Sequence, residues 1–297
     1  MLMLYFLIGL TTLLLILAFS VWLGSNALIA RRKPDPPASP ADHGLAFEDV
    51  SFKTSDDLTL RGWYIPAPDS ARTVVLCPGH NGSMDADVIA APWLHAAGFN
   101  VLMFDWRGHG RSEGARVSMG ALERLDLLAA VAFVRARGAA RVGVLGFSMG
   151  GAVALSTAAG CPDIHAVCSD GGFARVATAV ANGLRERGLP DPLPAIFGPI
   201  IVFAAGLQLG IDLRQADPMR WVDGIASRPV LFIHGERDSF VPIAEVEALV
   251  ARAQVTRSET DHNLELWRVP EAGHRDIHLL RAEEYRRRVI DFFTHAL

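Results

Sequence analysis

The feature that most constrains this chain is a five-residue turn, Gly146-Phe147-Ser148-Met149-Gly150. An apolar run at 142–145 precedes it and a run of small residues follows, which predicts a buried strand and then a helix packed closely on a sheet. The flanking glycines remove side chains that would clash at a sharp strand-to-helix turn, so the serine hydroxyl is held exposed. The sequence therefore predicts an α/β fold with an accessible serine at the end of a strand.

The partners that an activated serine requires follow it in the chain. A serine hydroxyl needs a general base and a carboxylate that orients the base. An apolar run at 228–235 predicts a strand that ends just before Asp238, and a second run at 264–269 ends shortly before His274. Because the carboxyl ends of parallel strands share one edge of a sheet, we expect Ser148, Asp238 and His274 to meet there.

The ordered motifs resemble the α/β-hydrolase superfamily, over about residues 46 to 297. The matching segments are Cys77-Pro78-Gly79-His80-Asn81-Gly82, Asp105-Trp106-Arg107-Gly108-His109-Gly110-Arg111-Ser112, and the three segments described above. The resemblance implies a mostly parallel central sheet with helices on both faces and a helical cap insertion. It also implies that Ser148 is the nucleophile, His274 the general base and later acid, and Asp238 the orienting acid.

Two positions of the resemblance leave alternatives open. Asp170 ends another apolar run, at a position where some members of the superfamily carry the acid, although the loop Gly235-Glu236-Arg237-Asp238 is closer to the usual pattern. The oxyanion site is expected to use the backbone N–H groups of Met149 and His80. The loop reads Pro-Gly before His80 where related hydrolases often read His-Gly. Asp105, Arg107 and His109 are expected to have a structural role.

The N-terminus predicts a membrane helix. Residues 1–30 contain no charged side chain, and Arg31-Arg32-Lys33 follows at once. The run exceeds the roughly 20 residues that cross a hydrocarbon core, whereas a signal peptide has a basic start and a core of about 7 to 15 residues. Ser25-Asn26-Ala27 could imitate a cleavage site, so a signal peptide remains the alternative. The positive-inside rule predicts a single-pass protein with its catalytic domain on the cytoplasmic face.

The rest of the chain reads as a linker and one domain. Residues 31–43 are rich in proline and predict an extended spacer that holds the domain off the bilayer. From residue 44 to 297 we expect one α/β-hydrolase domain, beginning with a hairpin of 47–52 and 58–65. The further elements expected from periodicity include helices at 121–137 and 283–296.

Between residues 171 and 227 the strand-helix alternation stops, and we expect the cap insertion there. Its central run, 195–211, is uncharged and mostly apolar. A second membrane span is disfavoured because the run is short and is broken by Pro199 and glycines, so a buried or lid segment is the favoured interpretation. An apolar lid beside a membrane anchor would suit an acyl or lipid-like substrate, although ordinary packing of a cap helix is the alternative.

Composition excludes several other classes of protein. The formal net charge of −4 comes from 28 basic and 32 acidic residues, so nucleic acid is not an expected partner. Three cysteines do not make a disulfide framework, and their number agrees with a reducing compartment. No zinc-like spacing, phosphate loop or dinucleotide fingerprint is present, so neither a cofactor nor a metal is expected.

The sequence thus predicts a membrane-anchored serine hydrolase that cleaves carboxylic esters through an acyl-enzyme, with lipid or acyl esters as candidate substrates. A thioesterase or a peptidase/amidase with the same three residues is the first alternative, because the fold does not settle the reaction. A dehalogenase is disfavoured because its elbow would carry Asp in place of Ser148. A catalytically silent, membrane-tethered binding module is the second alternative.

Overall fold

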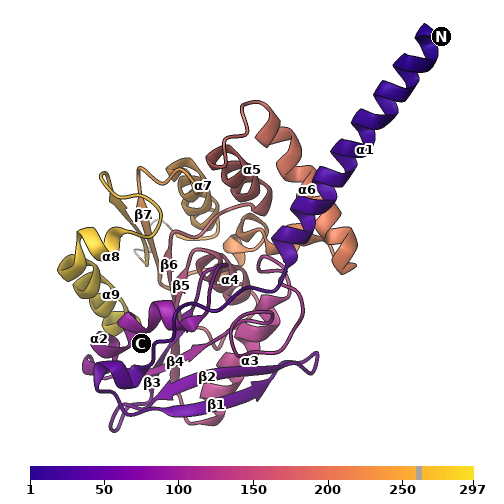
Figure 1. Cartoon of the computed structure of the whole chain (residues 1–297). Coiled ribbons are helices and arrows are strands. Elements are labelled where there is room, and N and C mark those ends of the chain that lie inside the picture. The colour runs from indigo at the N-terminus through magenta and orange to yellow at the C-terminus, as the bar shows by residue number, and fades with distance from the viewer. Residues whose placement is uncertain (259–262) are drawn as a thin grey trace.

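The computed structural model describes residues 1–258 and 263–297, and an eight-stranded sheet forms its centre (Figure 1). The strand order is β1-β2-β4-β3-β5-β6-β7-β8. The pairs from β4 to β8 are all parallel, whereas β2 is antiparallel to both β1 and β4. The strands are β1 (Glu48–Lys53), β2 (Thr59–Ile65), β3 (Arg72–Cys77), β4 (Asn100–Phe104), β5 (Arg141–Phe147), β6 (Ala166–Asp170), β7 (Val230–Gly235) and β8 (Leu264–Val269).

Helices cover both faces of the sheet, as the sequence predicts. Buried side chains of α2 and α9 pack with one face, and those of α3, α4 and α7 pack with the other. The strands between them are almost continuously apolar, which is typical of a parallel sheet buried on both sides. These helices are α2 (Ala91–Ala96), α3 (Glu123–Ala136), α4 (Met149–Ala158), α7 (Ile243–Gln254) and α9 (Ala282–Ala296), with the short α8 (Ile277–Leu280) before α9.

The expected hairpin is confirmed by the antiparallel pairing of β1 with β2. The expected helices correspond to α3 and α9, within a residue or two at each end. On α9 the apolar face predicted from periodicity supplies Tyr285, Val289 and Phe293 to the core, where all three are buried.

The insertion between β6 and β7 forms a cap. It contains α5 (Val176–Glu186) and α6 (Leu193–Leu209), followed by three short 3₁₀ helices: η3 (Leu213–Ala216), η4 (Pro218–Arg220) and η5 (Val222–Ile225). In Figure 1, α5 and α6 lie between the sheet and the N-terminal helix. The run that the sequence assigns to a buried or lid segment is therefore the body of α6.

The N-terminal helix α1 (Leu2–Ile29) projects from the domain (Figure 1). Within the described part of the chain, it is the helix long and apolar enough to cross a membrane. Its side chains are largely exposed as far as Leu23, and burial begins near Ser25. Gly24 and Ser25, near the end of the helix, contact α6, so α1 packs on the cap.

The proline-rich segment differs from the predicted spacer because it lies against the domain. Its backbone forms an isolated bridge from Ala30 to Arg116, and the Ser83 N–H donates to the Asp35 carboxylate at 2.7 Å. The Ala38 N–H donates to Asp85 at 3.2 Å. The end of the segment forms the short 3₁₀ helix η1 (Pro40–His43), and the contacts above hold the segment along the domain surface.

Candidate active site

The turn at Ser148 has the geometry of a nucleophile elbow. Ser148 links β5 to α4 and has a backbone φ of 51°, a left-handed value that is strained for a residue with a side chain. A Cβ on Gly150 would lie 2.0 Å from the carbonyl oxygen of Cys77, and a Cβ on Gly146 would lie 2.3 Å from the oxygen of Gly150. Only glycine fits at these two positions, which explains why they flank the serine. The Ser148 N–H donates to the Asp170 oxygen at 2.7 Å and fixes the turn to β6.

The three predicted side chains lie in one hydrogen-bonded line. His274 Nε2 is 3.0 Å from Ser148 Oγ, and His274 Nδ1 is 2.7 Å from Asp238 Oδ2. Because a carboxylate can only accept, the Nδ1–H donates to Asp238, and Nε2 is left to accept the serine proton. This tautomer is the one required for general-base catalysis at Ser148.

The Asp238 carboxylate is buried and fixed by its own loop. Its other oxygen, Oδ1, accepts the N–H groups of Phe240 at 2.9 Å and Val241 at 2.7 Å. His234 lies beneath it and donates from Nε2 to the Val241 oxygen at 2.6 Å. Burial lowers the pKa of His234, which favours the neutral form of this neighbouring ring.

Asp170, the alternative acid, has a different partner. Its Oδ2 accepts the Tyr285 hydroxyl at 2.9 Å, and burial raises the pKa of Asp170. The contact that Asp170 makes with the elbow uses its backbone oxygen rather than its carboxylate. The geometry therefore favours Asp238 as the residue that orients His274.

The loop after β3 lies against the elbow, as the oxyanion prediction requires. A Cβ on Gly79 would lie 3.8 Å from Ser148 Cβ. Met149 is the first residue of α4, so its N–H has no acceptor within the helix and can serve an oxyanion. His80 follows Gly79, and its side chain contacts Arg32 and Leu28 of the N-terminal segment.

The His80 ring is held by Arg32, a contact that the sequence analysis missed. Arg32 Nη2 lies 2.7 Å from His80 Nε2 and also donates to the carbonyl oxygens of Ala27 and Leu28 at the end of α1. Because a guanidinium only donates, His80 Nε2 must accept and the ring is neutral. Burial and the adjacent charge of Arg32 lower the pKa of His80 in the same direction. The end of α1 is thus joined to the candidate oxyanion loop.

The segment from Asp105 to Ser112 supports the site from outside, in agreement with its predicted structural role. The Asp105 carboxylate accepts the N–H groups of Met84 and Arg111, each at 2.8 Å. His109 bridges the backbone oxygens of Arg107 and His80, at 2.9 Å each. These side chains are committed to loop structure, and none contacts Ser148.

Arg107 organises an ion cluster beside this segment, in which Arg107 and Asp126 are buried and Asp56 is partly exposed. Its guanidinium contacts Asp126 and Asp56, each at 2.7 Å. Burial alone would lower the pKa of Arg107, but the hydrogen bonds to the two carboxylates raise it above its usual value. The cluster ties the β1–β2 turn to α3 and to the loop after β4.

A second ion pair, between half-buried Arg275 and buried Asp87, lies beside the site and was also missed. The two side chains are 2.5 Å apart, and the guanidinium lies 4.5 Å from the centre of the Phe147 ring. Arg275 follows His274 directly, and it contacts Phe147, which precedes Ser148. This one cation therefore links the chain segments of two candidate catalytic residues. The adjacency of Arg275 to His274 is the signal that could have identified it.

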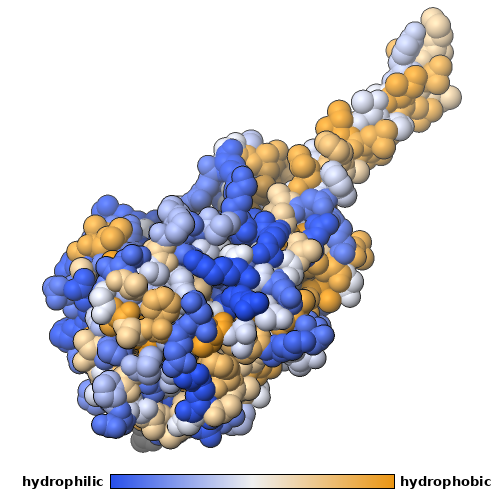
Figure 2. All heavy atoms as spheres, turned by 60° about the horizontal axis from the view of Figure 1, so that its bottom comes forward, coloured by the Kyte–Doolittle hydropathy of each residue, from blue (hydrophilic) through white to orange (hydrophobic). Residues whose placement is uncertain are grey.

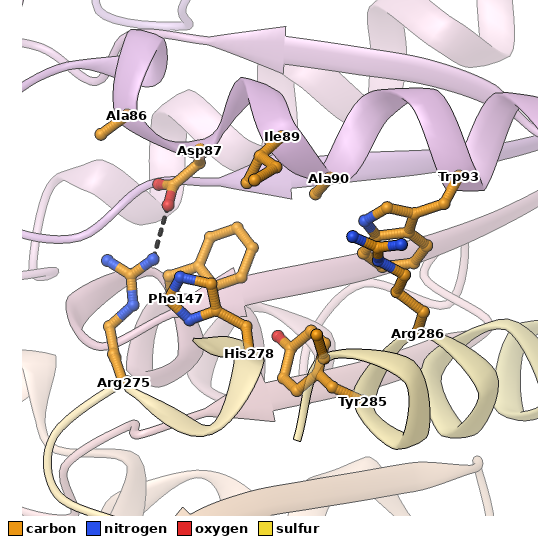
Figure 3. A pocket seen from close by; sticks show the side chains of 11 residues that line it. Ala86, Asp87, Ile89, Ala90, Trp93, Phe147, Arg275, His278, Tyr285 and Arg286 are labelled. Carbon is orange, nitrogen blue, oxygen red and sulfur yellow. Dashed lines mark hydrogen bonds and ion pairs between the residues drawn. The ribbon is translucent and has the colours of Figure 1, made fainter. Parts of the chain in front are cut away.

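Figure 3 shows the cavity next to this pair, about 280 Å³ in volume. Arg275 and Asp87 point toward each other on one side, and the rest of the lining includes the aromatic side chains of Trp93, Phe147 and Tyr285. Neither Ser148 nor His274 is among the lining residues, so the cavity is a neighbour of the site. Its lining comprises Ala86, Asp87, Ile89, Ala90, Trp93, Phe147, Arg275, His278, Ala282, Tyr285 and Arg286.

Within the described residues, no cluster of three or more His, Cys, Asp or Glu side chains has the arrangement of a metal site. The three cysteines are free and buried. Burial raises the pKa of Cys77 and Cys168, which makes them poor nucleophiles. The arrangement of Ser148, His274 and Asp238 favours nucleophilic attack by the serine.

Comparison with known proteins agrees with this reading of the fold. A family model described as "Serine aminopeptidase, S33" matches residues 68–196. The uncharacterized protein Rv2307c of Mycobacterium tuberculosis is 30% identical over 88% of this chain and 84% of its own. The uncharacterized protein YfhR of Escherichia coli K12 is 29% identical over 84% of this chain and 81% of its own.

Solved structures extend the comparison. The esterase Pf2001 of Pyrococcus furiosus is 27% identical, covers 90% of this chain and 98% of its own, and superposes with a TM-score of 0.75. The chain belongs to the α/β-hydrolase superfamily and is an esterase-like member of it.

Proposed function

We propose that the chain is a serine hydrolase that cleaves carboxylic esters through an acyl-enzyme, and that α1 holds it in a membrane. The observation that carries the proposal is the line from Ser148 Oγ through His274 to Asp238, with distances of 3.0 and 2.7 Å. The strained elbow presents the hydroxyl, and the esterase title of the Pyrococcus furiosus relative supports the reaction class.

The proposed reaction follows from this geometry. His274 Nε2 accepts the proton as Ser148 Oγ attacks the ester carbonyl, and Asp238 stabilises the imidazolium that forms. The N–H groups of Met149 and His80 stabilise the tetrahedral oxyanion. His274 then gives the proton to the leaving alcohol, and water releases the acid from Ser148 by the reverse sequence of proton transfers.

A peptidase is the second candidate because of the description of the matching family model. An aminopeptidase must bind a free ammonium group, which requires an available carboxylate near the serine. Among the described residues, three buried carboxylates near the site already have side-chain partners: Asp238 contacts His274, Asp87 contacts Arg275, and Asp170 contacts Tyr285. This pairing favours an uncharged ester over a charged peptide N-terminus.

The test is a substrate panel of acyl esters, acyl thioesters and aminoacyl anilides, assayed with the full chain in detergent. We expect ester hydrolysis in the wild type and its loss in Ser148→Ala. Ser156→Ala, a buried serine on the same helix with no hydrogen-bond partner, is the matched control and should retain activity. Preferential cleavage of the anilides would favour the peptidase, and thioester preference the thioesterase. A folded wild type inactive on every substrate would favour the silent binding module.

A further inference from the structure

Helix α6 carries an apolar face that no part of the described chain covers. Its sequence has no charged residue between Leu193 and Ile211. Five large apolar side chains recur at spacings of three and four residues, which places them along one face of the helix. Their exposed fractions range from 37% to 69%: Leu193, Ile196, Ile200, Phe203 and Leu207. Single exposed apolar residues are ordinary, whereas a contiguous stripe marks an interaction surface.

The opposite face of α6 is firmly attached to the protein. A Cβ on Gly198 would lie 2.9 Å from the Ala177 oxygen and from the Ala181 side chain, so α5 and α6 approach closely. Ile201, Val202 and Ala205 are buried. The helix is therefore a fixed part of the cap, and its exposed stripe faces away from the protein.

The stripe is continuous with the exposed surface of α1. A Cβ on Gly24 would lie 3.0 Å from the Ile201 side chain, and Gln208 Nε2 donates to Ser25 Oγ at 2.6 Å. In Figure 1, α6 crosses α1 at the base of the projecting helix, and Figure 2 shows hydrophobic residues covering that helix and extending onto the domain around its base. The exposed apolar surface of α1 therefore meets that of α6 at residues 24–25.

We infer that the outer face of α6 lies in the interfacial layer of the bilayer that α1 crosses. The inference rests on the proposed membrane anchor and is independent of the bond that Ser148 cleaves. The exposed apolar part of α1 ends at Leu23, and α6 is fastened to the next turn, so insertion of α1 brings α6 to the membrane surface. Charged side chains return at Asp191 and Asp212, beyond the two ends of α6.

With α6 at the membrane, a route for the substrate from the bilayer to the catalytic residues follows. Helix α5 lies between α6 and the catalytic residues: Asn182 donates to the Phe240 oxygen at 3.1 Å, and the Phe240 ring is 5.3 Å from the His274 ring. The cap that borders the site is thereby held against lipid. The substrate class that fits is a lipid ester whose acyl chain enters from the bilayer.

A fluorescent probe tests the inference in the full chain, reconstituted in phosphatidylcholine vesicles. The native cysteines are buried, so an environment-sensitive dye attaches selectively to Phe203→Cys. Leu10→Cys reports on α1, and Leu279→Cys, 70% exposed on α8 at the far side of the domain, is the matched control. Nitroxide lipids labelled near the headgroup or deep in the chain report the depth of each probe.

We expect the dye at position 203 to shift to the blue and to be quenched more by the shallow nitroxide, with position 279 unaffected. A dye at 203 that stays in water, while the dye at 10 is quenched, would overturn the inference and leave the anchor intact. A dye at 203 that is shielded from water but not quenched by lipid would also overturn it, because a second copy would then cover the stripe. Absence of quenching at 10 would overturn the anchor itself, whereas fluorophosphonate labelling of the same vesicles reports separately on Ser148.

A functional comparison sharpens the test. Phe203→Glu should slow hydrolysis of an ester embedded in vesicles several-fold and leave hydrolysis of a soluble short-chain ester unchanged, whereas Leu279→Glu should affect neither. Equal rates for wild type and Phe203→Glu on both substrates would contradict the role of α6.

Discussion

The loops around Ser148 differ from the outer surface of α1 and α6 in which side chains they bury and which they expose. Around the serine, charged groups are paired and wholly or partly buried, as in Arg107 with Asp126 and Arg275 with Asp87. On α1 and α6, large apolar side chains are exposed and unpaired over a continuous surface. The first region is complete within the chain. The second is the surface that we propose to lie against lipid, because burial of exposed apolar side chains away from water is favourable.

The largest expected effect separates the two carboxylates near the site. Asp238→Asn should lower kcat for ester hydrolysis by about 10⁴, because an amide cannot hold His274 in the required tautomer. Asp170→Asn is the matched control and should retain most of the activity, since the Asp170 side chain contacts Tyr285. The measurement is kcat with a soluble ester, alongside circular dichroism for folding. The opposite ranking would assign the acid to Asp170.

A large loss of stability is expected where the buried charges are broken. Arg107→Met leaves Asp126 unpaired in the interior, and the free energy of unfolding should fall by about 3 to 5 kcal/mol. Lys53→Ala removes an exposed pair with Asp57 and should change it by less than about 1 kcal/mol. Urea unfolding in detergent compares the two variants. Equal effects would show that the buried cluster does not support the loops.

Much of this fold and site is predictable from sequence because the signals are local. The apolar run, the glycines and Ser148 lie together, and the strand ends before Asp238 and His274 bring those residues to one edge. Other features depend on packing between distant segments. Asp87 and Arg275 form a pair across the chain, and neither one alone predicts the other. In the sequence, Arg32 is one of the basic residues that flank the predicted membrane helix. Its contact with His80 depends on how the linker folds back on the domain, which composition does not specify.

Arg32 joins the two regions, so its replacement tests their connection. Arg32→Ala should lower kcat about tenfold with little change in KM, because the His80 N–H would be displaced from the oxyanion, a smaller loss than removal of a whole donor. Arg32→Lys should restore part of the rate, and Lys33→Ala is the neighbouring control. A change in KM alone, or an unchanged kcat, would contradict a link between α1 and the oxyanion loop.

On the exposed apolar face of α6, replacement of a side chain should change the free energy of unfolding very little. Phe203→Ser removes a side chain that is 68% exposed, so the free energy of unfolding in detergent should change by no more than about 0.5 kcal/mol. Val202→Ser, at the buried neighbouring position, should cost markedly more. The two variants are compared by thermal unfolding. Equal losses would mean that Phe203 is covered within the protein itself.

A further small effect is expected on stability in acid. The hydrogen bond from Arg107 lowers the pKa of Asp56 from 3.8 to about 2, so ionised Asp56 stabilises the fold above about pH 4, and this contribution is lost as the pH falls toward 2. Asp56→Asn should remove that part of the pH dependence. Because Asp56 is 41% exposed, the loss at neutral pH should stay below about 1 kcal/mol. The free energy of unfolding is measured for both proteins between pH 5 and pH 2. The same pH dependence in wild type and Asp56→Asn would contradict this role of Asp56.

The central claim is that Ser148 is an activated nucleophile, and fluorophosphonate labelling tests it most directly. Wild type, Ser148→Ala and Ser156→Ala are treated in detergent, and the modified peptide is located by mass spectrometry. The geometry predicts a single adduct on Ser148 in wild type and in Ser156→Ala, and none in Ser148→Ala. A folded wild type that takes no label, or a label that persists in Ser148→Ala, would contradict the proposed mechanism.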